Sequence, residues 1–216
     1  PARNGPAPFT SGEELSYDVK VANLYVGRLE MKVGRTRALA GRPALAFFGR
    51  ARTNSFSGAV KESAGRYMAL VDPETFRPFA VRVESMYGTE RRLENARFAP
   101  DRKGIAAEFV WGGKPGKRAF RSSVPMFDVL TILYYARTRE FQPGTSVCQE
   151  VFAERRLWRM EATVQKPEEI STPAGDKPAY KVEVVLTPMP HPDINPKRPA
   201  FPVEIDMFLS HDDARV

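Results

Sequence analysis

The stretch VPMFDVLTILYYARTR, residues 124–139, gives the clearest helix signal in the chain. Asp128 precedes its apolar run, and a carboxylate there suits the orphan N–H groups and the positive dipole of a helix start. Ile132 and Leu133 follow at helical spacing, and Gly144 comes after the last turn. A short helix that is apolar on most sides needs a cover, so we expect a β-sheet to pack on it. The pattern allows two roles for the helix, a plug in the core or the wall of a ligand cavity.

Most of the remaining chain alternates apolar and polar residues, as half-buried β-strands do. In residues 14–21, for example, Leu15, Tyr17 and Val19 share one face. About a dozen such strands and one helix predict a mainly β fold, with an antiparallel, strongly curved sheet or open barrel wrapped around one central helix. One continuous sheet is our first expectation and a sandwich of two sheets the second. We expect a single domain over residues 13–216, preceded by a flexible tether over residues 1–12.

Composition narrows the class of protein. The net charge is +7, which favours an anionic neighbour. The single cysteine, Cys148, excludes an internal disulfide. No apolar run approaches the ~20 residues that a membrane-spanning helix needs. The Pro- and Gly-rich start resembles a tether that follows a removed export signal or a lipid anchor.

The sequence offers little for catalysis or metal binding. There is no HExxH, CxxC, G-x-S-x-G or phosphate-binding glycine loop. The strongest group of N/O ligands is His191, Asp193, His211, Asp212 and Asp213, which lack the spacing of a known metal motif. We therefore expect no metal, no cofactor and no enzymatic activity.

Basic residues recur along several predicted strands, with aromatic residues between them. The densest group is predicted to bind an anionic surface: Arg91, Arg92, Arg97, Arg102 and Lys103. Such a face suits anionic lipid head groups or lipopolysaccharide, and we expect no nucleic-acid partner because there is no dense basic tail. The alternative is that these arginines keep the sheet soluble and block its edges.

Large aromatic and aliphatic residues suggest an apolar ligand site inside a curved sheet. The predicted lining is Phe109, Trp111, Leu130, Tyr134 and Trp158. The same residues would equally fill a closed core, and the sequence leaves both interpretations open.

Four stretches taken in order resemble a family: Gly12 to Val19, residues 72–78, residues 127–137 and residues 209–216. The chain resembles a family of exported Gram-negative bacterial proteins classified only as a domain of unknown function. The resemblance implies a β-rich periplasmic or outer-membrane-associated protein, and it brings no activity or catalytic residues. Family members usually continue past residues 210–216 with a further strand, so we expect an edge strand that is exposed or completed by a partner.

These observations lead to one expected function and one alternative. The first is a non-catalytic cell-envelope protein that binds an apolar or lipid-like ligand, or an anionic envelope component. The alternative is a structural or adaptor subunit of an envelope complex. Its contacts with another envelope protein would involve the terminal edge strand or the proline-rich loop over residues 188–202.

Overall fold

The computed structural model describes most of the chain. The described ranges are residues 7–21, 24–54, 62–172, 175–192 and 201–210. The chain divides into two compact units. The N-terminal unit is Thr10–Ser123, and the C-terminal unit is Val124–Val216 with Pro1–Phe9.

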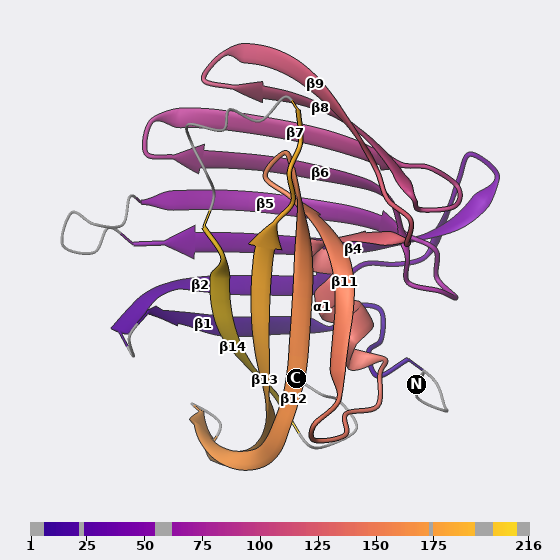
Figure 1. The fold of residues 1–216 in the computed structure, drawn as a ribbon. Coiled ribbons are helices and arrows are strands. Elements are labelled where there is room, and N and C mark those ends of the chain that lie inside the picture. Colours follow the sequence, from indigo (N-terminus) through magenta and orange to yellow (C-terminus); the bar gives the residue numbers. More distant parts are fainter. Residues whose placement is uncertain (1–6, 22–23, 55–61, 173–174, 193–200, 211–216) are drawn as a thin grey trace. The chain divides into compact units, whose positions relative to one another are not determined.

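The N-terminal unit is a nine-stranded sheet in which every pair of neighbouring strands is antiparallel (Figure 1). Its strands are β1 (Glu14–Val21), β2 (Leu24–Val33), β3 (Arg37–Leu39), β4 (Arg42–Thr53), β5 (Ser63–Val71), β6 (Pro78–Tyr87), β7 (Glu90–Phe98), β8 (Gly104–Trp111) and β9 (Lys114–Arg121). They lie in the order β1-β2-β4-β5-β6-β7-β8-β9, and the short β3 pairs with β4. Because β1 and β9 end this order without pairing with each other, the sheet is open.

Alternation along each strand separates the two faces of this sheet. In β4, Phe47 is fully buried while its neighbour Phe48 is 40% exposed. The buried face also contains Val71 and Ala96, and we call it the core face. Position 27 on β2 requires glycine because the backbone of β4 lies very close to it, and a Cβ there would lie 2.1 Å from the backbone oxygen of Arg52.

The C-terminal unit contains a five-stranded sheet and the helix α1 (Val129–Arg137). Its strands are β10 (Met126–Asp128), β11 (Ser146–Ala153), β12 (Arg156–Thr172), β13 (Gly175–Pro188) and β14 (Val203–Ser210), in that order. The pair β10–β11 is parallel and the others are antiparallel. The helix lies against β10 and β11, where Ile132 packs with Phe127 and Val151.

The cap of α1 follows the sequence signal. The Oδ1 atom of Asp128 accepts hydrogen bonds from the N–H groups of Leu130 at 3.0 Å and Thr131 at 3.1 Å. Its Oδ2 atom accepts a short bond from the Thr131 hydroxyl. Asp128 is only 2% exposed, and burial raises the pKa of its carboxyl although these hydrogen bonds act in the opposite direction.

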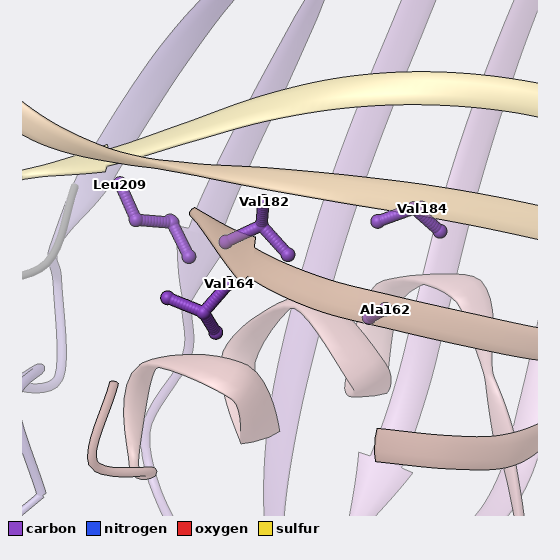
Figure 2. Close-up of a cluster of buried hydrophobic side chains, with 5 residues drawn as sticks. All are labelled: Ala162, Val164, Val182, Val184 and Leu209. Atoms are coloured by element: carbon purple, nitrogen blue, oxygen red, sulfur yellow. The ribbon is translucent and has the colours of Figure 1, made fainter. Parts of the chain in front are cut away.

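A compact apolar cluster stabilises the smaller sheet (Figure 2). It comprises Ala162 and Val164 of β12, Val182 and Val184 of β13, and Leu209 of β14. Cross-strand register explains the grouping, because Ala162 lies opposite Val184 and Val164 lies opposite Val182. Residues on one face of neighbouring antiparallel strands pack directly against each other.

The expected fold class is confirmed, since the described residues form mainly antiparallel β-structure with one short helix and an open sheet. The expectation of one continuous sheet is wrong, because β10 pairs with β11 and not with β9. The helix begins at Val129, directly after Asp128, the residue expected at its start. In the described part of the chain, no helix is long and apolar enough to cross a membrane.

The expected domain limits stay a prediction. Part of the expected tether is packed, because Phe9 is buried and its ring lies edge-on to Tyr134, with centroids 5.2 Å apart. Arg137, fully buried in α1, donates a hydrogen bond of 3.1 Å to the Pro8 carbonyl. Residues 1–6 lie outside the described residues.

Candidate functional site

One face of the nine-stranded sheet, opposite the core face, displays arginines on five neighbouring strands. Strand alternation and register place their side chains on a common face. We call this the arginine face, and its arginines are Arg28, Arg50, Arg52, Arg66, Arg82, Arg91 and Arg97. All of them are exposed, so their charge lies at the surface, although Arg28 and Arg82 form ion pairs with Asp18 and Glu84.

Like charges lie directly opposite each other in the middle of this face. Arg50 of β4 is the register partner of Arg66 of β5, and Arg52 of β4 is the partner of Arg28 of β2. Direct opposition of like charges in a sheet is destabilising. Two acidic residues border the Arg50–Arg66 pair, since Glu30 lies opposite Arg50 and Glu84 lies opposite Arg66.

Glu84 is already engaged by another arginine. Arg82, two residues away on the same strand, donates to the Oε1 atom of Glu84 from both Nε, at 2.9 Å, and Nη2. The bond from Arg82 and its charge hold the pKa of Glu84 below its usual value, and the charges of Arg91 and Arg66 lower it further. Glu84 therefore stays ionised at neutral pH, and its charge is paired with Arg82 and not with Arg66.

The centre of the face is a shallow hollow of about 250 Å³. Its lining is Arg50, Ala51, Arg52, Ala64, Gly65, Arg66, Glu84, Ser85, Met86 and Arg91. We call this the arginine hollow. Ala64 lies between Arg52 and Met86 in register, so its small side chain leaves a low point among long ones. Within the described residues, none of its four arginines forms an ion pair with a carboxylate.

A second hollow of about 470 Å³ lies over β7, β8 and β9. It is lined by Leu93, Asn95, Glu108, Phe109, Val110, Pro115, Gly116 and Lys117. We call this the apolar hollow because Leu93, Val110 and Pro115 form a register row across it. The two hollows adjoin on β7, where Arg91 belongs to one and Leu93, two residues on, to the other.

The structure separates the basic residues that the sequence grouped. Arg91 and Arg97 lie on the arginine face. Arg92 points to the other face, where its guanidinium lies 4.1 Å from the ring centroid of Trp111 and 4.6 Å from that of Tyr87. Cation–π contacts of this kind hold it in the sheet.

The other two residues of that group, Arg102 and Lys103, lie in the turn between β7 and β8. Nη1 of Arg102 donates to the carbonyl oxygens of Ala99 at 3.0 Å and Pro100 at 2.8 Å. Arg102 therefore has a structural role in the turn, and burial lowers its pKa. The assignment of all five residues to an anionic surface stays a prediction.

The predicted apolar ligand residues fall in both units. Phe109 and Trp111 are half-buried on β8, and Phe109 lines the apolar hollow. Leu130 and Tyr134 are buried in α1. Trp158 is half-buried on β12 and donates from Nε1 to the Ala153 carbonyl at 3.2 Å. No one unit contains all five residues, and their role in ligand binding stays a prediction.

Of the possible metal ligands, only His191 belongs to the described part of the chain, because Asp193, His211, Asp212 and Asp213 lie outside it. The described residues contain no group of three or more His, Cys, Asp or Glu side chains arranged to hold a metal ion.

Sequence reasoning missed Arg50 and Arg52, which lie in the arginine hollow. Their spacing of two within β4 was visible in the sequence. Their position beside Arg66 and Arg91 depends on the register of four strands, which no local pattern reports.

Comparison with known proteins gives a family but no activity. The family model described as "Protein of unknown function (DUF3108)" matches residues 16–195. No curated protein matches the chain. Among solved structures, the chain is similar to a beta-barrel-like protein of domain of unknown function DUF1849 from Brucella abortus, at 9% identity and a TM-score of 0.48. That similarity covers 88% of this chain and 78% of the other.

Proposed function

Because the chain belongs to the DUF3108 family of proteins of unknown function, we propose a function from its own surface. The protein is a non-catalytic, exported component of the bacterial cell envelope. It binds the anionic head groups of envelope lipids through the arginine face. The observation that carries this proposal is the group of four arginines in one hollow, free of ion pairs with the described carboxylates.

Charge supports this proposal. Each basic residue near an anionic membrane surface contributes about 1 kcal/mol to binding, so four neighbouring arginines are enough for measurable affinity. Register places these arginines on one face of the sheet, so a single anionic surface can meet them together. Arg50, Arg52, Arg66 and Arg91 come from three strands of that face.

Exposed apolar side chains lie among these charges. Phe48 is 40% exposed, Met86 41% and Val110 37%, and all three belong to the arginine face by register. Mixed apolar and cationic side chains suit the head-group region of a bilayer, where stems contact acyl chains and charged ends stay in water.

Vesicle binding tests this function. We expect the protein to sediment with vesicles that contain phosphatidylglycerol and to stay in solution with phosphatidylcholine vesicles. Binding is electrostatic, so it should fade between about 0.1 M salt, where the Debye length is about 10 Å, and 1 M salt, where it is about 3 Å. The same result at both salt concentrations would contradict an electrostatic mechanism.

Variants locate the binding face. The triple variant Arg50→Glu, Arg66→Glu and Arg91→Glu should lose binding at least tenfold. A matched control with the same change in net charge uses three exposed basic residues of the C-terminal unit, Arg159→Glu, Lys166→Glu and Lys177→Glu. The control should bind nearly as the wild type does. If both triple variants lose binding equally, only the net charge matters and the arginine face is not the site.

A second candidate, the adaptor subunit, is favoured by one edge of the smaller sheet. β14 ends the strand order and has no second partner strand among the described residues. Its first residues expose apolar side chains, with Val203 at 42% and Ile205 at 41%. An open apolar edge accepts a strand from another protein. Native mass spectrometry of the protein purified from its own envelope separates the two, since bound lipid supports the first function and a bound protein the second.

A further inference from the structure

We propose that the arginine hollow is a specific site for one phosphomonoester group. This inference deepens the proposed lipid-binding function and rests on it. A general electrostatic face would bind any anionic surface in proportion to charge. The hollow, in contrast, should bind a single small dianion and discriminate it from a phosphodiester.

The size of the hollow favours a head group over a whole ligand. Sites for complete small molecules usually occupy about 300–1,000 Å³. The arginine hollow measures about 250 Å³ and is open to solvent. A compact tetrahedral anion fits such a space, and whatever carries the anion extends outside it.

The donors in the hollow match phosphate chemistry. A guanidinium presents several N–H groups in a planar fork and binds phosphate oxygens in pairs. Arg50 and Arg66 are direct cross-strand partners, and their Cβ atoms are therefore about 4.5–5.5 Å apart. Two guanidinium groups on such neighbours can reach the same anion from adjacent strands.

A bound dianion would relieve the charge opposition in this sheet. Without a ligand, Arg50 repels Arg66, and Glu84 is committed to Arg82. Elsewhere on the same face, opposite charges are paired across strands, as in Lys32 with Glu14. The unpaired like charges are therefore concentrated at the hollow, where an anion between them would convert repulsion into two attractions.

The adjoining apolar hollow indicates where the rest of the ligand extends. Leu93 follows Arg91 by two residues on β7 and faces the same side. Residues at this spacing in a strand are about 6.6–6.8 Å apart. In the register row that contains Arg66, Leu93 lies two strands away, at about 9.4–9.8 Å, with Glu84 between them. An amphiphile with its phosphate between Arg50 and Arg66 would therefore reach Leu93, Val110 and Pro115 with its apolar chain and not with its first apolar atoms.

Calorimetric titration of the full chain tests the site with defined probes. The probes are inorganic phosphate, dihexanoyl phosphatidic acid and dihexanoyl phosphatidylglycerol, all at constant low ionic strength and pH 7.5. We expect one phosphate per chain. We also expect phosphatidic acid to bind at least fivefold more tightly than phosphate, and the phosphodiester lipid to bind at least fivefold more weakly than phosphatidic acid.

Two variants and a control assign the binding to the hollow. Arg50→Gln and Arg66→Gln should each weaken the binding of inorganic phosphate at least fivefold. Arg97→Gln is the matched control, because Arg97 lies on the same face but outside the hollow, with Ala80 and Ala106 as its register partners. It should bind phosphate as the wild type does, and thermal melting should show that all three variants are folded.

The charge state of the ligand provides an independent readout. The second pKa of a phosphomonoester is about 6, so the affinity for dihexanoyl phosphatidic acid should fall severalfold from pH 7.5 to pH 5.5. Sulfate stays dianionic over this pH range, so its affinity for the hollow should stay the same. Of the carboxylates that face the hollow, Glu84 has a lowered pKa and stays charged over the same interval.

The outcomes separate this inference from the function on which it rests. Wild-type affinity for phosphate in Arg50→Gln and Arg66→Gln would overturn the phosphate site, while vesicle binding would still support the broader function. Phosphate binding without vesicle binding would support a phosphate site for a soluble ligand and overturn the lipid function. Equal affinity for the phosphomonoester and phosphodiester lipids would show that the hollow does not discriminate the dianion, which overturns the inference.

Discussion

The opposition of Arg50 and Arg66 should be measurable as a repulsive coupling energy in the ligand-free protein. The change is a double-mutant cycle made of Arg50→Thr, Arg66→Thr and the double variant. Each single variant loses the repulsion, but each also loses an acidic neighbour, Glu30 or Glu84. We therefore expect the single variants to differ little from the wild type, and the cycle isolates the term that belongs to the pair.

Coulomb's law sets the expected size of that term. Two unit charges about 7 Å apart in water repel each other by about 332/(80 × 7), or about 0.6 kcal/mol. Measured cross-strand pairs contribute about 0.2–1 kcal/mol, which includes this value. The double variant should therefore gain about 0.6 kcal/mol less than the sum of the two single variants, because the repulsion can be removed only once.

Urea unfolding at two salt concentrations provides the measurement. Midpoints compared with a common m-value give differences in the free energy of unfolding without a long extrapolation. The coupling should be present at 0.01 M salt, where the Debye length is about 30 Å, and absent at 1 M salt, where it is about 3 Å. A control cycle of Arg66 with Arg97, which are not register partners, should be additive. An attractive or salt-independent coupling between Arg50 and Arg66 would refute the reasoning.

Three further predictions concern the fold. Ile132→Ala should lower the free energy of unfolding by about 2–5 kcal/mol, because Ile132 is only 8% exposed. Val129→Ala is the control, because Val129 is 43% exposed, and it should change the free energy of unfolding by less than about 0.5 kcal/mol. Calorimetric unfolding of both variants measures the difference. Asp128→Asn keeps a capping oxygen, so we expect the helix to persist. Burial raises the pKa of Asp128 in the folded protein. Proton binding to Asp128 therefore adds to the free energy of unfolding; this stabilisation is complete below the ordinary carboxyl pKa of about 3.9 and is lost as the pH rises through the pKa of the folded protein. The Asn variant should lose this part of the pH dependence in urea unfolding. Gly27→Ala should cost about 1–3 kcal/mol by overpacking, because the new Cβ would lie 2.1 Å from the backbone oxygen of Arg52, and a wild-type melting temperature would contradict this.

Local patterns in the sequence were sufficient for the elements and the fold class. Asp128 caps the helix as predicted, and the alternation in residues 14–21 gives β1 with the same limits. The sequence left one continuous sheet and two separate sheets open, because the choice depends on which strand pairs with β10. Met126–Asp128 lies in the segment with the helix signal but ahead of the helix, and its parallel pairing with β11 makes it a strand.

The sequence predicted that the candidate site is basic, but it did not predict which arginines lie together. Arg91 and Arg92 are adjacent in a strand, so alternation alone requires that they face opposite sides, and grouping them ignored this rule. The position of Arg50 and Arg52 beside Arg66 required the register of β4 with β5. Register is a long-range property, since one residue of slip moves every side chain to the other face.

If the arginines served only to keep the sheet soluble, as in the alternative interpretation, we would expect a different arrangement of charges. A soluble sheet face needs charges, but it is most stable when opposite charges are neighbours. The outer strands meet that demand, with ion pairs between Asp18 and Arg28 and between Glu108 and Lys117. The pair of strands β4 and β5 does not, because Arg50 lies opposite Arg66. The same face thus contains ion pairs, including Arg82 with Glu84 on the central strand β6, beside one pair of arginines that lie directly opposite each other. Solubility alone explains the first arrangement, and the second is explained when an anionic ligand completes it.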